Sequence, residues 1–241
     1  MARARQAKRE RRQAGIFAAT GRFIRRWVLR FAFIFVVLVA LAVVLFAVVN
    51  PPTTLYMAAE KARHGGVRHT WVTFDGIAPV MARSVVAAED ANFCTHWGFD
   101  MTAIRQVIAA GERRGASTIS QQVVKNVYLW PERSWVRKAL EALITPAVEL
   151  VWSKQRILEV YLNVAEFDTA VFGVEAAAQH HFGVPAAALS PRQAAYLAAV
   201  LPDPKGRSAT RPTPFLDRRA ASIADGAETI RRDGRAACFE G

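Results

Sequence analysis

The sequence has few cysteines, and it lacks the motifs of redox centres, Cys/His metal sites and phosphate loops. Only two cysteines occur among 241 residues, Cys94 and Cys238, with no Cys-x-x-Cys pair and no His/Cys ligand cluster. A glycine-rich phosphate loop and internal repeats are also absent from the sequence. In an oxidising compartment the two cysteines could pair, but sequence alone does not join a mid-chain position to the chain end. We therefore expect two free or buried thiols.

Acidic residues are nearly missing from the first 49 positions. This segment has ten basic residues and one acidic residue, so it carries +9 of the formal net charge of +12. Residues 50–241 carry the remaining +3. Because most of the basicity belongs to a leader, the charge distribution argues against a uniformly basic nucleic-acid-binding domain. We expect no nucleic-acid partner.

Residues 31–49 form a run of 19 uncharged, almost entirely apolar residues. As a helix this run is about 28 Å long, close to the thickness of a bilayer core. A cleaved signal peptide is the main alternative, but its apolar core is usually about 7–15 residues long and ends at a small-x-small site. Here Asn50-Pro51-Pro52 follows instead. A buried core helix would show a polar face, and this run has none.

We therefore predict three parts: a basic cytoplasmic segment over 1–30, an uncleaved transmembrane helix over 31–49, and an outward-facing domain over 50–241. The positive cluster ahead of the span predicts a cytoplasmic N-terminus.

The outward domain reads as mainly α-helical. Apolar spacing, caps and prolines predict helices over 78–88, 101–110, 118–129, Pro131 to Trp152 with a kink at Pro146, 153–162, 174–182, and Pro191 to just before Pro202, followed by an amphipathic C-terminal helix. Thr70–Phe74 alternates in the manner of a short strand. A compact α-rich domain follows from this pattern.

Glu89 and Asp90 come at the C-terminal end of the helix expected over 78–88. The helix dipole and a neighbouring carboxylate both raise the pKa of a carboxyl group toward the range of a general base. The alternative is that both side chains only solvate the helix end. A lone histidine such as His96 is more often a structural residue than a ligand.

A second polar segment covers residues 115–126. Ser117, Gln121 and Lys125 are spaced to share one helical face, where hydroxyl, amide and ammonium donors could hold a phosphorylated ligand. The alternative is a solvated polar face.

A third segment repeats this spacing with Arg133, Arg137 and Glu141, flanked by Lys138. The alternatives are intrahelical ion pairs or a cationic stripe beside a second carboxylate. Two carboxylates alone would suit a glycosidase, which needs a general acid for a poor leaving group. Cations suit a pyrophosphate leaving group, so the combination favours glycosyl transfer from a diphosphate-activated sugar.

These segments, in this order, resemble the peptidoglycan glycosyltransferases (glycosyltransferase family 51), over about residues 71–204. The matching motifs are Glu89-Asp90-x-x-Phe93-x-x-His96-x-Gly98-Phe99-Asp100, Gly115-Ala116-Ser117-Thr118-Ile119-Ser120-Gln121-Gln122-x-x-Lys125-Asn126, Arg137-Lys138-x-x-Glu141, Lys154-x-Arg156-Ile157-Leu158-Glu159-x-Tyr161-Leu162-Asn163 and Phe172-Gly173-Val174-Glu175-Ala176-Ala177-Ala178. Ala116 departs from a glycine common in the family.

The resemblance implies a lysozyme-like, mainly α fold with a smaller membrane-proximal lobe. It implies polymerisation of lipid II with inversion and release of undecaprenyl diphosphate. Glu89 matches the general base, and Glu141 matches a second essential carboxylate. Lys125 and Arg133 match residues that contact the diphosphate. The remaining substrate-binding positions carried over are Ser117, Thr118, Gln121, Gln122, Asn126 and Arg137.

The resemblance also implies a bacterial inner-membrane protein with a periplasmic catalytic domain. Its partners would be lipid II, the growing glycan strand and other cell-wall synthesis or division proteins. Some members use a divalent cation, Mg²⁺ or Mn²⁺, but no metal ligands are evident in this sequence. We expect no transpeptidase domain, since about 37 residues follow the matched region.

Two other functions stay open. A lysozyme-like lytic enzyme would share the fold and a catalytic glutamate without requiring Lys125 and Arg133. A membrane-anchored scaffold without activity is the second, although Glu89, Lys125 and Glu141 are all present.

Overall fold

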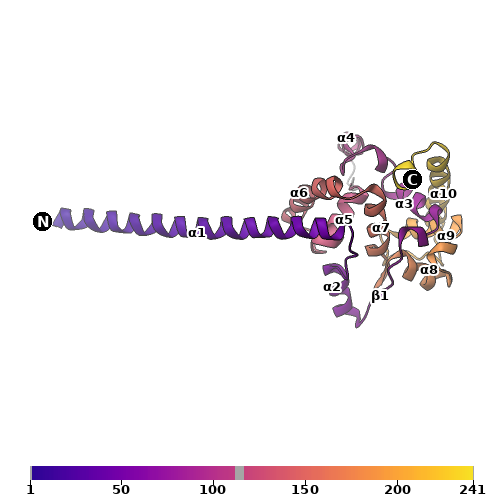
Figure 1. Cartoon of the computed structure of the whole chain (residues 1–241), viewed down its shortest axis with the longest axis horizontal. Coiled ribbons are helices and arrows are strands. Elements are labelled where there is room, and N and C mark those ends of the chain that lie inside the picture. The colour runs from indigo at the N-terminus through magenta and orange to yellow at the C-terminus, as the bar shows by residue number, and fades with distance from the viewer. Residues whose placement is uncertain (1, 112–116, 241) are drawn as a thin grey trace. The chain divides into compact units, whose positions relative to one another are not determined.

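The computed structural model describes residues 2–111 and 117–240 (Figure 1). Gly115 and Ala116 of the predicted second motif lie outside the described residues. The chain divides into two compact units, Met1–Leu45 and Phe46–Gly241. The elements are α1 (Ala2–Phe46), α2 (Leu55–His64), β1 (Arg68–His69), η1 (Phe74–Gly76), α3 (Pro79–Glu89), η2 (Phe93–Thr95), α4 (Met101–Ala110), α5 (Ile119–Tyr128), α6 (Trp135–Val151), α7 (Lys154–Val164), β2 (Glu166–Asp168), β3 (Val171–Phe172), α8 (Val174–Phe182), η3 (Ala186–Ala188), α9 (Pro191–Val200), α10 (Pro214–Arg232) and α11 (Ala237–Glu240).

The first unit consists of α1 up to Leu45, and its apolar part coincides largely with the predicted span. Phe23–Phe46 has a mean hydropathy of 3.0 and is long and apolar enough to cross a membrane. Only 6% of its most apolar stretch is buried, which argues against a core helix. A signal sequence near the N-terminus passes the same test, so this helix alone is weak evidence for an anchor.

The second unit is mainly helical, as the sequence predicts, and a lysozyme-like glycosyltransferase domain fits it. One group of helices contains α3, α9 and α10, which pack on one another (Figure 1). In a second group, α5 packs against both α6 and α7. The cores are apolar faces at helical spacing, such as Met81 and Val85 on α3 and Val123 on α5, all fully buried. The placement of a smaller lobe next to a membrane stays a prediction.

A small sheet joins distant parts of this unit. Its strand order is β1-β3-β2, with β1 parallel and β2 antiparallel to β3. The strand predicted over Thr70–Phe74 is wrong: β1 ends at His69, and η1 begins at Phe74. The Asn163 side chain accepts from Val72 N and donates to Val72 O, each at 2.9 Å. An amide side chain thus satisfies the backbone groups that a neighbouring strand would otherwise bond.

Helix α6 begins later than expected, which changes the third motif. Ser134 is the N-cap, and its hydroxyl accepts from Arg137 N at 3.1 Å. Pro131 therefore lies outside the helix, and Arg133 precedes its first turn. A serine that caps the free N–H groups starts a helix better than a proline three residues earlier. Arg133 is not on the α6 face that carries Arg137 and Glu141, contrary to the prediction. The helix runs through Pro146 to Val151.

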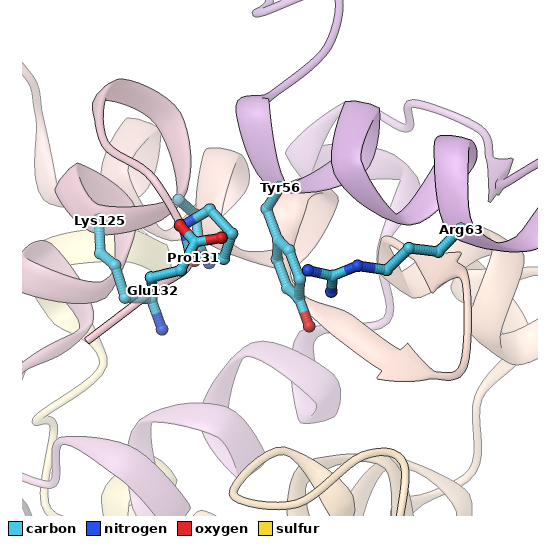
Figure 2. A pocket seen from close by; sticks show the side chains of 6 residues that line it. Tyr56, Arg63, Lys125, Pro131 and Glu132 are labelled. Atoms are coloured by element: carbon cyan, nitrogen blue, oxygen red, sulfur yellow. The ribbon is translucent and has the colours of Figure 1, made fainter.

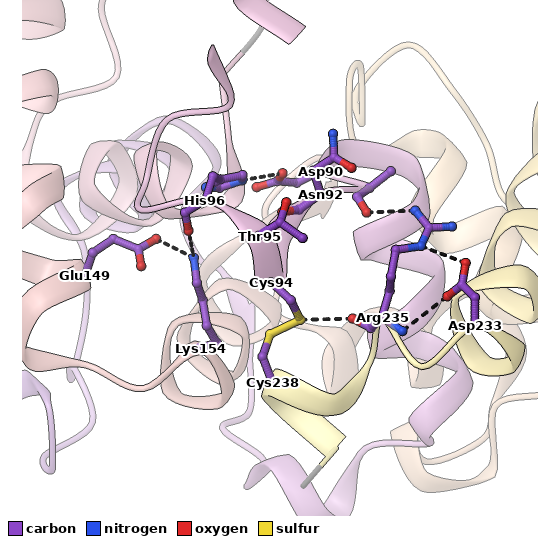
Figure 3. The surroundings of a disulfide bond; sticks show 11 residues. Asp90, Asn92, Cys94, Thr95, His96, Glu149, Lys154, Asp233, Arg235 and Cys238 are labelled. Carbon is purple, nitrogen blue, oxygen red and sulfur yellow. Dashed lines mark hydrogen bonds and ion pairs between the residues drawn. A yellow bond between two sulfur atoms is a disulfide. The ribbon is translucent and has the colours of Figure 1, made fainter. Parts of the chain in front are cut away.

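The expectation of two free thiols is wrong. Cys94 and Cys238 form a disulfide that joins η2 to the short C-terminal helix α11 across 144 residues, with the Cα atoms 5.6 Å apart (Figure 3). Neighbouring contacts hold the same two segments together. The rings of Phe93 and Phe239 lie 6.4 Å apart, and Arg235 donates to Ala91 O at 3.1 Å. The chain end returns to the residues that follow Glu89, a pairing that depends on the tertiary fold.

We expect the double substitution Cys94→Ser/Cys238→Ser to lower the free energy of unfolding by about 2–5 kcal/mol, because the unfolded chain regains the freedom of a long loop. Thermal unfolding of the purified protein, followed by circular dichroism with and without dithiothreitol, measures this effect. Reductant should lower the melting temperature of the wild type and leave that of the double variant unchanged. Equal melting temperatures for the oxidised wild type and the variant would contradict the prediction.

Candidate active site

Glu89 is the last residue of α3 and points toward the second group of helices. Its Oε2 accepts from Gln122 Nε2 on α5 at 3.0 Å, and its Oε1 lies 3.9 Å from the Arg219 guanidinium on α10. The side chain is 14% exposed. Burial raises the pKa of Glu89, and the hydrogen bond from Gln122 with the nearby positive charges of Arg219 and Lys125 only partly opposes that shift. A carboxylate in this setting is a stronger base than an exposed one.

Asp90 faces the other way and has a structural role. Its Oδ1 lies 2.7 Å from His96 Nε2, and its Oδ2 accepts from Ile119 N at 3.0 Å. Asp90 therefore fixes the first turn of α5 against the end of α3. Of the two adjacent carboxylates, Asp90 is therefore used by contacts within the fold, and Glu89 can still interact with a ligand. His96 is a structural partner of Asp90, as expected.

Glu141 on α6 is buried among cations. Arg137 Nη1 donates to Glu141 Oε2 at 2.9 Å, and Lys138 Nζ donates to Glu141 Oε1. Lys138 also donates to Ser117 at 2.9 Å, and Arg137 Nε donates to Glu132 O at 2.9 Å. Glu141 therefore forms ion pairs within α6, and the hydrogen bond from Lys138 to Ser117 connects α6 to the segment that precedes α5. Glu141 orients two cations in this arrangement.

Lys125 connects the two carboxylates electrostatically. Burial lowers the pKa of Lys125, and the negative charges of Glu141 and Glu89 partly restore it. Its ammonium makes no hydrogen bond or ion pair to any residue in 2–111 or 117–240. A desolvated, uncommitted cation between two carboxylates can receive an anionic group of a ligand.

Gln122 fixes the position of the Glu89 carboxylate by a hydrogen bond. While its amide nitrogen donates to Glu89, its Oε1 accepts from the hydroxyl of Tyr161 on α7 at 3.3 Å. Tyr161 is fully buried, and burial with the nearby charges of Glu89 and Asp90 raises the pKa of its hydroxyl. The tyrosine therefore stays a neutral donor, which fixes the amide orientation that presents N–H to Glu89.

A cavity of about 330 Å³ adjoins Lys125 (Figure 2). Its lining comes from α2, α5 and the segment before α6, and consists of Tyr56, Arg63, Lys125, Asn126, Pro131 and Glu132. In Figure 2, Arg63 extends from α2 toward Tyr56, with Lys125 on the other side. Lys125, the amide of Asn126 and Arg63, which is paired with Glu60, thus border one cavity together with the Glu132 carboxylate. An anionic group would find donors at the Lys125 end of this cavity.

The other predicted residues serve different roles. Thr118 and Gln121 form the capping box of α5, and both are buried. The Thr118 hydroxyl donates to Gly98 O at 2.7 Å. Ser117 precedes the helix and contacts Lys138, so the expected face of Ser117, Gln121 and Lys125 does not form. Arg133 is exposed beside the cavity-lining residue Glu132.

Comparison with known proteins identifies the family of this chain. A model of the family described as Transglycosylase matches residues 56–228. This chain belongs to the transglycosylase family. It is therefore a glycosyltransferase, as its motifs predict.

Relatives of this transglycosylase are similar along nearly their whole length. A biosynthetic peptidoglycan transglycosylase of Jannaschia sp. (strain CCS1) is 62% identical over 237 residues, which covers 98% of each chain. The protein of that name from Rhodospirillum centenum (strain ATCC 51521 / SW) is 47% identical over 223 residues, covering 90% of this chain and 96% of the relative. One from Escherichia coli O17:K52:H18 (strain UMN026 / ExPEC) is 47% identical over 213 residues, with coverages of 83% and 88%.

Four residues of the candidate site are missing from the sequence-based prediction. Tyr161 lies within one of the matching motifs, but nothing in the sequence indicates that its hydroxyl pairs with Gln122. Tyr56 and Arg63 line the cavity from α2, which comes before the matched motifs. Arg219 approaches Glu89 from α10, 130 residues further along the chain. Only the fold brings these side chains to the site.

Proposed function

We propose that this transglycosylase polymerises lipid II into glycan strands of peptidoglycan, releases undecaprenyl diphosphate and thereby contributes to cell-wall synthesis. The observation that carries the proposal is the half-buried Glu89, held by Gln122 and within electrostatic reach of Lys125. The names of the relatives support the peptidoglycan substrate.

In the proposed reaction, Glu89 removes the proton from the 4-hydroxyl of the acceptor sugar. The resulting oxygen attacks the anomeric carbon of the donor, whose bond to the diphosphate breaks with inversion. The bonding electrons leave with the diphosphate, so charge accumulates on the leaving group. Lys125 and Arg133 are well suited to receive that charge, because neither is committed to a carboxylate among the described residues. Glu141 would hold Arg137 and Lys138 in place beside them.

A divalent cation, used by some relatives according to the resemblance, does not fit this site. Glu141 already accepts from Arg137 and Lys138, and Glu89 accepts from Gln122 beside Arg219. A divalent ion between these groups would be repelled by Arg137, Lys138 and Arg219, and it would have to displace them to gain carboxylate oxygens as ligands. We therefore assign no catalytic step to a metal at this site.

For the membrane, we propose a single pass through an inner membrane near Phe23–Phe46, with the N-terminus in the cytoplasm. Ten basic residues before position 31 support this orientation. The second unit would then lie in the periplasm, where the disulfide can form. From the family resemblance, we also propose that other cell-wall synthesis or division proteins act together with this one.

Incubation of the purified protein with lipid II as the sole substrate tests the proposal. New glycan polymer and free undecaprenyl diphosphate are expected. A lytic enzyme would instead cleave preformed glycan and make no polymer from lipid II. An inactive scaffold would do neither, and both outcomes would overturn the proposal.

The pH dependence of polymerisation should report the raised pKa of Glu89. The base works only when ionised, so activity should fall as pH decreases through that pKa, above the range of an exposed glutamate. Gln122 stabilises the charged form, so Gln122→Ala should move the acidic limb of kcat/KM to higher pH. Gln179→Ala on the exposed face of α8 is the matched control. An unmoved acidic limb in Gln122→Ala would contradict the assignment of Glu89 as the titrating base.

A further inference from the structure

Three potential metal ligands meet at the end of α8: the adjacent histidines His180 and His181, and Asp168 from strand β2. Asp168 ends β2, and His180 and His181 lie in the last turn of α8. Their ligand atoms all lie within 4.8 Å of one another. Asp168 Oδ2 is 3.5 Å from His180 Nε2 and 3.6 Å from His181 Nε2. Asp168 Oδ1 accepts from Thr169 N at 2.6 Å, which leaves Oδ2 facing the two rings.

His181 is arranged as metal-binding histidines usually are. Its side chain is 3% exposed. One ring nitrogen of His181 forms a hydrogen bond with the backbone of Phe167. The other, Nε2, is buried without a hydrogen-bond partner among residues 2–111 and 117–240. Burial and the neighbouring His180 lower the pKa of His181, against the opposing effects of Asp168 and Phe167. With the proton on the nitrogen that faces Phe167, the Nε2 lone pair points toward the Asp168 carboxylate. Two acceptors facing each other at this distance repel unless a proton or a metal cation lies between them.

The two distances from Asp168 to the histidines suit a small divalent ion. Zinc bonds to nitrogen and oxygen are about 2.0–2.2 Å, so two ligand atoms of a tetrahedral site are about 3.4 Å apart. Both distances from Asp168 Oδ2 are close to that value. The last turn of α8 adds the negative end of the helix dipole. Two imidazoles and one carboxylate are a donor set that zinc and related transition metals prefer over Mg²⁺.

We propose that Asp168, His180 and His181 form a binding site for Zn²⁺ or a similar transition-metal ion. The ion would clamp the β2–β3 turn onto the C-terminal end of α8 and keep one coordination position for water. None of these three residues belongs to the Glu89 site, so the proposal stands independently of the proposed function.

Arg68 on β1 competes with the ion for the His180 ring. Its Nη1 lies 3.1 Å from His180 Nδ1, and because arginine can only donate, Nδ1 must accept and the neutral ring carries its proton on Nε2. Binding of a metal through Nε2 requires that proton to move to Nδ1 and the Arg68 contact to break. Arg68→Gln should therefore tighten metal binding, because a glutamine oxygen can accept from Nδ1–H and no positive charge remains. A merely structural His–Asp cluster gives no reason for this gain.

Calorimetric titration of the untagged, EDTA-treated full chain in detergent with ZnCl₂ tests the site. One ion per chain is expected, with a weaker affinity in His180→Ala and in Asp168→Asn. The loss should exceed the roughly 10–100-fold that follows removal of a group orienting a ligand. His180 is exposed, so its removal leaves the core intact. His64→Ala on α2 is the matched control and should bind like the wild type.

A second measurement uses stability. Zinc at about 100 times its dissociation constant should raise the melting temperature of the wild type by roughly 5 °C or more, and should not raise that of His180→Ala. A wild-type dissociation constant weaker than about 1 mM, equal affinities in the wild type and His180→Ala, or weaker binding in Arg68→Gln would each overturn the proposal.

Discussion

Glu89→Gln is expected to lower the rate of lipid II polymerisation by about 100- to 10,000-fold, the range that a positioned general base contributes. Glutamine keeps the size of the side chain and can still pair with Gln122, but it cannot take the proton from the acceptor hydroxyl. The binding of substrate should change little, since Lys125 and the cavity beside it are untouched. The effect should therefore appear in kcat more than in KM.

Stability separates this result from simple unfolding. Because the pKa of Glu89 is raised in the folded protein, the ionised carboxylate is disfavoured there, and its cost is present at pH above that pKa. Replacing it with a neutral amide should leave the melting temperature at pH 7 equal to or higher than that of the wild type. Glu228→Gln, at an exposed carboxylate on α10, is the matched control and should keep full activity. A Glu89→Gln protein that polymerises at the wild-type rate would show that another group is the base.

Helix positions in this chain could be predicted from local signals. The helices at 101–110 and 174–182 have the predicted bounds, because glycine follows each of them in the left-handed conformation and ends it. The capping box at Ser190 likewise starts α9 where the sequence indicates. The strands could not be predicted, because β1 pairs with residues about 100 positions later and has only two residues.

The candidate site was predictable in its residue types and less so in their roles. Motif order identified Glu89, Lys125 and Glu141, which the fold brings into electrostatic contact. The prediction of shared helical faces, however, required that α5 and α6 begin before Ser117 and Arg133. The caps at Thr118 and Ser134 place Ser117 and Arg133 outside their helices, so their expected faces do not exist. Long-range pairings such as Cys94 with Cys238 depend on how the chain end folds back, and no local pattern encodes that return.

Lys125→Ala should reduce lipid II polymerisation by about 100-fold or more, the cost of removing one preorganised charge from a transition state that develops negative charge. Lys125 is half-buried, so water replaces its charge poorly. Lys61→Ala, at an exposed lysine on α2, is the matched control and should remain near wild-type activity.

Arg133→Ala should also lose activity, by less than Lys125→Ala, because an exposed guanidinium interacts with a diphosphate through water and salt. The loss of activity in Arg133→Ala should be larger at low salt concentration. At high salt, screening already weakens the interaction of Arg133 with the diphosphate in the wild type. Arg211→Ala, another exposed arginine, serves as its control. Both active-site variants should fold, since neither side chain pairs with a described carboxylate. Intact polymerisation in both would refute contact with the diphosphate, and an effect of Arg133→Ala larger than that of Lys125→Ala would show that the leaving group lies outside the buried end of the site.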